Sequence, residues 1–247
     1  MALIMIDVTE KEKSEQMRRE FTANVSHELK TPLQSISGYA ELIEGGVAKE
    51  EDVRPFAGKI HREAQRLEQL VEDIISLSHL DEGASGLKWE IVDLRTVAQS
   101  AVGRLEAEAA EHQVQLTLQG SGAPLYGIPR LLDSLVFNLL DNAIKYNKPG
   151  GSVRIDVENT EGTMKLTVSD TGIGIPEEHL SRIFERFYRV DKSHSKAIGG
   201  TGLGLSIVKH AAVIHQASVE VTSKPGLGST FTVLFPKQAG ISARTAK

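Results

Sequence analysis

The N-terminal third of the chain carries two long series of apolar positions set among charged ones. Along residues 10–45 the apolar side chains recur every three or four positions, and a second series with this spacing runs from Val53 to Leu77. Such spacing collects the apolar side chains on one helix face, so it predicts two amphipathic helices of roughly 30 residues each. Gly45 and Gly46 mark the end of the first helix.

A hairpin of two such helices, each about 45 Å long, has one apolar stripe per helix and cannot bury both stripes well alone. Two hairpins together form a four-helix bundle, so the pattern favours a homodimer. An intramolecular coiled-coil spacer has the same pattern, and the apolar positions alone do not decide between the two.

The pattern changes after the second helix. Small residues in 81–88 indicate a linker, and beyond it short β-like runs alternate with helical ones. The β-like runs are 114–118, 153–158, 165–169, 219–223 and 230–235, and the helical runs are 94–111, 130–146 and 203–215. Because they do not follow a regular βαβ order, they predict an α/β sandwich with helices on one face of a sheet.

The chain is therefore expected to have two domains joined by the linker 81–88. Residues 11–80 form the all-α hairpin of a dimeric four-helix bundle, and residues 89–236 form the α/β sandwich. Residues 237–247 are expected to be a loose tail. Residues 1–10 resemble the last strand of a PAS-type sensor domain, which indicates that the chain is part of a longer receptor.

The composition excludes several classes of site. Of the 247 residues, 40% are hydrophobic and 25% charged, which is typical of a globular protein. The absence of cysteine excludes disulfides, thiolate zinc sites and cysteine nucleophiles. A net charge of −5 gives no reason to expect a nucleic-acid partner. The apolar residues 2–6 are too few for a membrane span, so a membrane anchor would lie in a missing part of the receptor.

The first candidate for chemistry is the run FTANVSHELKTPL at residues 21–33. On a helix His27 points away from the apolar stripe, and a largely neutral, exposed imidazole offers a nucleophilic nitrogen. Glu28 could accept the other ring N–H, and Thr31, one turn further on, could hold a water. Pro32 removes a backbone bond beside them. For an isolated His–Glu pair, an ordinary surface pair remains the better interpretation, and the zinc motif HExxH is excluded because Thr31 replaces its second histidine.

Three further clusters lie in the second half. Asn138, Asn142 and Lys145 share one face of a predicted helix, where amide oxygens can bind Mg²⁺ and an ammonium group can meet phosphate. Asp170 follows a predicted strand and precedes two closely spaced glycines. The glycine-rich run 199–204 leads into a helix, an arrangement that can cradle phosphate. For the helix face alone, a merely solvated surface is the better interpretation, and each glycine cluster alone is a weak signal that could be an ordinary loop.

Two common nucleotide-binding motifs are excluded. A P-loop needs Gly-Lys-Ser/Thr, and no such tripeptide follows these glycines. A dinucleotide-binding GxGxxG would need glycine where Glu177 and Leu205 stand. A nucleotide bound by this half must therefore be held by a different geometry.

Together these runs resemble the motifs of the histidine kinase family, in the family's order and spacing. Residues 21–33 are similar to its H-box, 138–146 to its N-box, 170–175 to its G1 box, 184–189 to its F-box and 200–205 to its G2 box. The resemblance covers residues 10–236 and, within the family, is strongest to receptors of the phosphate-sensor or cell-wall-sensor type. It implies a Bergerat-fold ATP-binding domain.

The resemblance also implies roles for individual residues. His27 would accept the phosphoryl group with Glu28 and Thr31 beside it, and Arg189 would reach the γ-phosphate of ATP. Asp170 would bind the adenine amino group, Asn142 and Asn138 would hold Mg²⁺, and Lys145 and Tyr146 would meet phosphates or ribose. The other residues implied to contact the nucleotide are Gly172, Gly174, Ile175, Gly200, Thr201, Gly202, Leu203, Gly204, Leu205 and Thr230. Residues 190–199 would form a mobile lid.

The implied function is that of an ATP-dependent protein-histidine kinase, the cytoplasmic portion of a membrane-anchored receptor. It would phosphorylate its own His27, transfer the phosphoryl group to an aspartate of a response regulator, and, from the ExxT pattern at 28–31, also dephosphorylate that regulator. One alternative is a Bergerat-fold ATPase or an anti-sigma-type serine kinase, against which Asn138 argues, because hydrolysing relatives carry a glutamate base there. The other alternative is an inactive nucleotide-binding scaffold.

Overall fold

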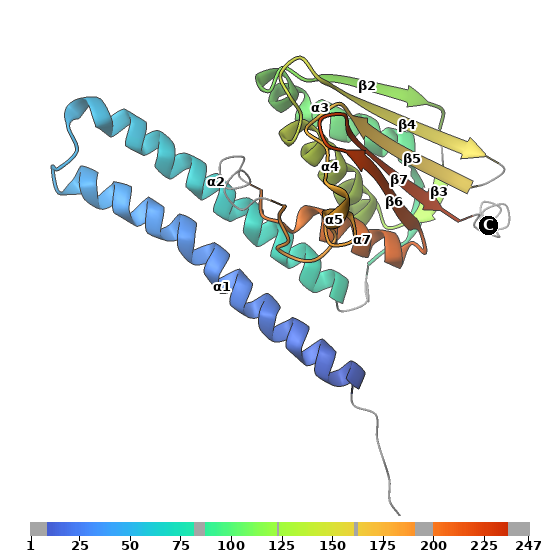
Figure 1. Ribbon diagram of the computed structural model, residues 1–247, viewed down its shortest axis with the longest axis horizontal. Coiled ribbons are helices and arrows are strands. Elements are labelled where there is room, and N and C mark those ends of the chain that lie inside the picture. Colours follow the sequence, from blue (N-terminus) through green and yellow to red (C-terminus); the bar gives the residue numbers. More distant parts are fainter. Residues whose placement is uncertain (1–8, 82–86, 123, 161–162, 191–199, 237–247) are drawn as a thin grey trace, which may run out of the picture. The chain divides into compact units, whose positions relative to one another are not determined.

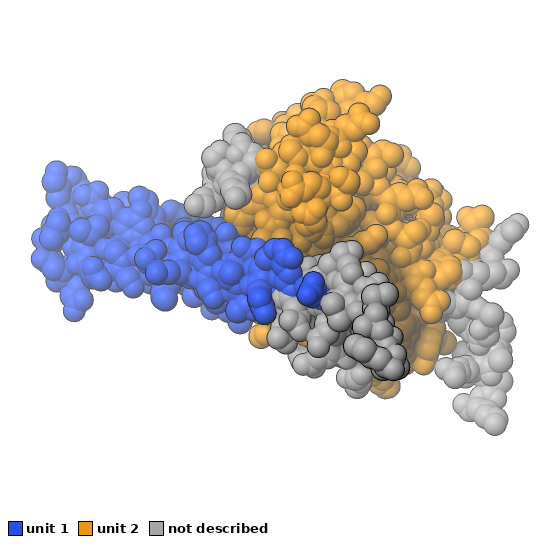
Figure 2. Space-filling view, turned by 60° about the horizontal axis from the view of Figure 1, so that its bottom comes forward, with its two compact units in different colours: residues 1–72 blue, residues 73–247 orange. Residues whose placement is uncertain are grey.

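The computed structural model describes residues 9–81, 87–122, 124–160, 163–190 and 200–236. The chain divides into two compact units, Met1–Glu72 and Asp73–Lys247, which Figure 2 draws in blue and orange. Four expectations fall outside the described residues, entirely or for the larger part. These are the PAS-like start at 1–10, the linker at 81–88, the lid at 190–199 and the tail at 237–247.

The first unit is built from two long helices. Helix α1 spans Thr9–Glu44, and helix α2 begins at Glu50 and continues to Asp81, beyond the boundary of the unit. Gly46 adopts a positive φ of 65° in the turn between them, a conformation that favours glycine. The two predicted helices and the break between them are confirmed.

Aromatic packing joins the two helices near their connected ends. The ring centroids of Tyr39 on α1 and Phe56 on α2 lie 5.1 Å apart, and the ammonium group of Lys59 lies 4.9 Å above the Tyr39 ring. Within the described part of this unit, however, only Pro32 and Leu70 are buried. The hairpin therefore leaves much of its apolar surface in contact with water.

The second unit is centred on a five-stranded sheet with the order β2-β4-β5-β7-β6. Its strands are β2 (Gln115–Gly120), β4 (Ser152–Thr160), β5 (Thr163–Asp170), β6 (Ser218–Lys224) and β7 (Gly228–Phe235). Strand β2 runs parallel to β4, and the other neighbours are antiparallel. All five strands were predicted from the sequence to within a few residues.

Three helices cover one face of this sheet (Figure 1), namely α3 (Leu94–Glu111), α4 (Pro129–Lys145) and α7 (Gly204–Ile214). Buried side chains alternate along β4, β5 and β7, as expected for strands with one covered face. They meet the apolar faces of the helices in a continuous core whose fully buried members include Leu132, Leu140, Ile155, Leu166 and Phe235. The predicted α/β sandwich with helices on one face is confirmed.

Three short elements were not predicted. Strands β1 (Glu90–Asp93) and β3 (Pro124–Gly127) pair antiparallel in a separate small sheet, and α5 (Glu177–Leu180) is a single helical turn. Each has only four residues, too few to show a periodicity. Asp93 ends β1 and caps α3, because its carboxylate accepts a hydrogen bond of 2.9 Å from the Arg95 backbone N–H.

None of the helices in the described residues combines the length and the apolar character that crossing a bilayer requires.

Candidate functional site

His27 lies on the exposed side of α1, as the helical pattern predicts. The neighbouring Glu28 is half-buried, and its carboxylate lies 3.8 Å from the guanidinium of Arg66 on α2. Arg66 also lies 3.9 Å from Glu63. Glu28 therefore belongs to a small charged cluster across the hairpin, directly beside an accessible imidazole.

The next turn of α1 carries Thr31 and Pro32. The Thr31 hydroxyl donates to the carbonyl oxygen of His27 at 3.2 Å. Pro32 has no N–H to offer the helix, but α1 continues through it to Glu44. The hydroxyl predicted to hold a water therefore lies one turn from the histidine and is anchored to its backbone.

In the second unit, Asp170 lies at the end of β5 with a half-buried carboxylate. Its Oδ1 accepts the backbone N–H groups of Gly172 at 2.8 Å and of Ser229 at 3.2 Å. Burial raises the pKa of Asp170, and these two hydrogen bonds oppose the rise. Because both amides use Oδ1, Oδ2 is the oxygen that the described residues leave for a ligand's amino group.

The glycines of the G1 box are required by close approaches of the backbone. A Cβ atom on Gly172 would overlap the Tyr146 carbonyl, and one on Gly174 would overlap the carbonyl of Lys224. Gly174 also has a positive φ of 69°. This packing holds the loop after Asp170 against both the end of α4 and the turn between β6 and β7.

The predicted polar face of α4 is present. Asn138 Nδ2 donates to the Ser134 carbonyl at 2.8 Å. A carbonyl can only accept, so this bond identifies the Asn138 nitrogen and leaves its Oδ1 on the opposite side. A Cβ atom on Gly204 would lie 2.6 Å from that Oδ1 and 3.6 Å from Asn142 Nδ2. The two amides of the N-box thus lie against the start of α7, where the G2 box ends.

Lys145 is engaged in an ion-pair cluster. Its ammonium group lies 2.7 Å from Asp141 and 3.8 Å from Glu108 on α3. Burial lowers the pKa of Lys145, but the two carboxylates outweigh this effect and raise it. Burial also raises the pKa of Glu108, against the opposing effect of Lys145. The cation predicted to meet phosphate is therefore held by two carboxylates in this structure.

The G2 box meets the N-box and the F-box. A Cβ atom on Gly200 would lie 3.2 Å from the Tyr146 hydroxyl, and the Thr201 hydroxyl accepts the Leu203 N–H at 3.2 Å. The Phe187 N–H donates to the Gly202 carbonyl at 2.8 Å. Gly202 has a φ of 75°, and Phe187 adopts a φ of 62°, which is unusual for a bulky residue.

Most of the predicted nucleotide-binding residues are therefore brought together in the second unit. The N-box, the G1 box and the G2 box surround one region at the ends of α4 and α7. Arg189 follows Phe187 by two residues, so its backbone lies near the G2 box.

Thr230 is placed differently. Its hydroxyl donates to Ser169 Oγ at 3.0 Å, and in the antiparallel register Thr230 pairs with Ser169 on the face of the sheet opposite the Asp170 carboxylate. The neighbouring Ser229 lies on the Asp170 side and is buried. Side chains alternate strictly between the two faces of a strand, and this alternation is the sequence signal that distinguishes Ser229 from Thr230.

His215 was not predicted to support the site. Its Nδ1 lies 2.7 Å from the Ala211 carbonyl, which can only accept, so Nδ1 carries the proton. Nε2 therefore accepts the Ile128 N–H at 2.9 Å. Ile128 precedes α4 without a side-chain cap of its own, so His215 joins the start of α4 to the end of α7. Burial lowers the pKa of His215, against the opposing hydrogen bond to Ala211.

The residues near Gly204 fit a magnesium site of the kind that a nucleotide completes. Mg²⁺ prefers oxygen ligands and is commonly bound by one or two protein groups together with phosphates and water. Asn138 Oδ1 is fixed by the bond of its nitrogen to Ser134, as required of an oxygen ligand. Among the described residues there is no cluster of three or more His, Asp or Glu side chains that could bind a metal alone.

Comparison with known families matches both units. Residues 17–83 match the His Kinase A (phospho-acceptor) domain. Residues 127–239 match the family described as histidine kinase-, DNA gyrase B-, and HSP90-like ATPase. The two matches include the H-box histidine and all four boxes assigned to nucleotide binding.

Two curated relatives support the same family assignment. The chain is 41% identical over 233 residues to the sensor-like histidine kinase SenX3 of Mycolicibacterium smegmatis, covering 94% of this chain and 60% of that protein. It is 39% identical over 250 residues to the phosphate regulon sensor protein PhoR of Pseudomonas aeruginosa, covering 99% and 56%. This match supports the predicted likeness to phosphate sensors. The chain thus spans about three fifths of the length of these curated relatives.

A solved structure has a similar fold. The histidine kinase AdeS of Acinetobacter baumannii aligns with a TM-score of 0.71 and 25% identity, over 86% of this chain and 98% of that one.

Proposed function

Because the chain belongs to the sensor histidine kinase family, we propose that it uses Mg-ATP to phosphorylate its own His27. The main support is the surroundings of Asp170. A carboxylate at the end of β5 is fixed through one oxygen by Gly172 and Ser229, and glycine backbone approaches it closely. This arrangement suits an acceptor for the amino group of a flat base, with the N-box and the G2 box available for the phosphates.

The chemistry we propose is a direct transfer. The unprotonated ring nitrogen of His27 attacks the γ-phosphorus, an N–P bond forms, and the bond from phosphorus to the bridging oxygen breaks, so that ADP leaves with the electron pair. The imidazolium product keeps its other ring N–H, and we assign the adjacent Glu28 carboxylate to stabilise it. Arg189 is assigned to the γ-phosphate charge, following the resemblance.

Asn138 and Asn142 would hold Mg²⁺, which neutralises phosphate charge when it is bound with ATP. Position 138 also distinguishes a kinase from a hydrolase, because the amide of Asn138 cannot remove a proton from water. His27 is then the favoured acceptor of the phosphoryl group, and the ATPase alternative lacks its base.

We propose that the phosphoryl group passes from His27 to an aspartate of a response regulator. Phosphohistidine is a high-energy donor, and an exposed imidazole is accessible to a second protein. We also assign Glu28 and Thr31 to the opposing reaction, in which the chain removes the phosphoryl group from the regulator. Its support is the ExxT pattern and the position of the Thr31 hydroxyl one turn from His27.

We also propose that the chain works as a homodimer and is the cytoplasmic portion of a membrane-anchored receptor. The poor burial of the hairpin supports the first proposal, since a second hairpin would cover its apolar residues. The second proposal rests on the family and on the greater length of the curated relatives.

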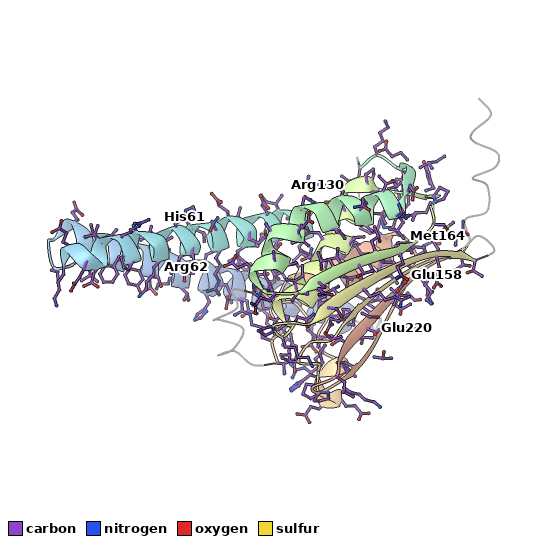
Figure 3. All side chains as sticks on the ribbon, turned by 90° about the horizontal axis from the view of Figure 1, so that it is seen from above. His61, Arg62, Arg130, Glu158, Met164 and Glu220 are labelled. Carbon is purple, nitrogen blue, oxygen red and sulfur yellow. The ribbon has the colours of Figure 1, made fainter. Side chains whose placement is uncertain are left out.

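The test is incubation with Mg-ATP labelled at the γ-phosphate, comparing the native chain with His27→Gln and His61→Gln. His61 is an exposed histidine on α2 and serves as a matched control (Figure 3). We expect acid-labile, base-stable label on the native chain and on His61→Gln, and at least a thousandfold less on His27→Gln.

Two other results would contradict the proposal. Steady release of inorganic phosphate from all three proteins, without stable label, would indicate an ATPase. Bound nucleotide with neither label nor phosphate release would indicate a scaffold.

A further inference from the structure

Ser223, on the edge strand β6, makes contacts that neither the family motifs nor the nucleotide roles account for. Its half-buried hydroxyl oxygen lies 2.7 Å from the Ile175 backbone nitrogen, 3.0 Å from the Gly228 carbonyl oxygen and 2.9 Å from Ser229 Oγ. These three partners come from the G1 box and from β7. One hydroxyl thus joins segments that are about 50 residues apart in the sequence.

The direction of each hydrogen bond follows from the chemistry of the partners. The Gly228 carbonyl can only accept, so the Ser223 proton goes to it. The Ile175 N–H can only donate, so it occupies one lone pair of Ser223. The second lone pair is left for the Ser229 hydroxyl proton. Ser223 therefore uses its whole hydrogen-bonding capacity, one donor and two acceptors, which fixes its orientation.

The two segments joined by Ser223 are the ones that hold the Asp170 carboxylate. Gly172, in the G1 box with Ile175, donates to Asp170 Oδ1, and Ser229 on β7 donates to the same oxygen. A parallel link runs from the Gly226 N–H to the Ile173 carbonyl at 2.7 Å. The orientation of the carboxylate thus depends on the spacing between the G1 box and β7, and Ser223 bridges that spacing.

We propose that Ser223 is a positioning residue that sets the selectivity of this site for 6-amino over 6-oxo purines. This proposal rests on the proposed function, in which Asp170 binds the adenine amino group. A carboxylate oxygen held in one direction accepts from the 6-amino group of adenine but faces the 6-carbonyl of guanine acceptor to acceptor. If the G1 box separates from β7, the Asp170 carboxylate can turn, and the discrimination between adenine and guanine falls.

The experiment measures dissociation constants of ADP and GDP, with Mg²⁺, for the full chain by calorimetry. In Ser223→Ala the Ile175 N–H and the Ser229 hydroxyl lose their shared partner, so we expect ADP to bind about tenfold more weakly. GDP binding should stay the same or tighten, so the preference for ADP should fall by about tenfold or more. At saturating ATP the rate of phosphorylation should change less than twofold, because the phosphate-binding residues are untouched.

Matched variants separate positioning from general damage. Ser229→Ala leaves Ser223 bonded to Ile175 and Gly228, so its effect should be smaller. Thr222→Ala, at an exposed position of the same strand, should leave both dissociation constants unchanged. Ser223→Thr keeps a hydroxyl and should recover most of the preference for ADP. Thermal unfolding of each variant shows whether the fold is intact.

The outcomes distinguish this inference from the proposed function. Native protein that binds neither ADP nor ATP would contradict the proposed function itself. Native protein that prefers ADP, with a folded Ser223→Ala variant of the same preference, would overturn only the role of Ser223. Equal weakening of ADP and GDP would also overturn it, since a purely structural effect does not distinguish the bases.

Discussion

The two units bury their apolar residues very differently. In the hairpin, Val53 is 38% exposed and Val71 is 42% exposed, although both belong to the apolar series of α2. In the α/β unit, Leu132, Ile155 and Phe235 are completely buried. Full burial of such a side chain contributes about 1.5–3 kcal/mol, so the second unit gains from its own core what the hairpin does not gain alone.

The two units are therefore stabilised in different ways. The α/β unit is stabilised within one chain and can position a ligand site through its own contacts. The hairpin displays an exposed histidine and leaves its apolar series for another surface to cover. The nucleotide site should therefore be sensitive to single side chains in the second unit, whereas the assembly of the protein should be sensitive to the apolar series of the first.

The largest expected effect is that of Asp170→Asn. An amide at this position can still accept the Gly172 and Ser229 N–H groups, but it no longer presents a charged acceptor to an amino group. We expect the dissociation constant of ADP to rise at least a hundredfold in calorimetry. Because burial raises the pKa of Asp170, the native carboxylate costs stability at neutral pH, so the variant should unfold at an equal or higher temperature.

The hairpin provides the control for Asp170→Asn. Its dimerisation, measured by sedimentation, should be unchanged by the substitution, because the two units are stabilised separately. A loss of both nucleotide binding and dimerisation, or a clear drop in the unfolding temperature, would contradict the separate stabilisation of the two units.

The second prediction addresses the hairpin. Val53→Glu places a carboxylate in the apolar series of α2, which should weaken a dimer by about 2 kcal/mol, or roughly thirtyfold. Sedimentation over a range of concentrations measures this, while ADP binding should be unchanged. Arg62→Glu is the matched control, because nine residues further along the helix it lies on the opposite side from Val53. An equal effect of the two substitutions would show that charge, and not the apolar series, controls assembly.

The sequence predicted the long elements well because their periodicity is strong. The helices α1, α2, α3, α4 and α7 and the five strands of the main sheet each repeat a pattern over several residues. The four-residue elements β1, β3 and α5 do not, so they were missed. Their existence depends on tertiary contacts, such as the stacking of Trp89 on Tyr126, with ring centroids 5.6 Å apart.

The site was predictable in its residue types but not in its supporting contacts. Asp170, Asn138 and Gly204 were assigned from motifs, and the structure brings them to one region. The engagement of Lys145 by Asp141 and Glu108, by contrast, depends on how α3 packs beside α4. The three bonds of Ser223 likewise depend on strand register, which the sequence alone does not reveal.

The smallest predicted effect concerns His215 and the pH dependence of the α/β unit. His215 is 2% exposed, and Trp89 and Phe235 pack against its ring at centroid distances of 5.2 and 6.2 Å. Its neutral form accepts the Ile128 N–H, and protonation would place a second N–H against that donor. Burial therefore lowers the pKa of His215 below the ordinary value of about 6.5, with no charged neighbour contributing.

Through His215, the stability of the α/β unit depends on pH. Below about pH 6.5 the unfolded chain binds a proton at this histidine that the folded chain does not, so stability should fall as the pH decreases. His215→Gln replaces the imidazole with an amide that can accept from Ile128 but cannot titrate. It should reduce the loss of unfolding free energy between pH 7 and pH 5, measured by chemical unfolding of the α/β unit. If His215→Gln kept the native pH dependence, protonation of His215 would not control the stability of the α/β unit. Its acid sensitivity would then have to come from its carboxylates.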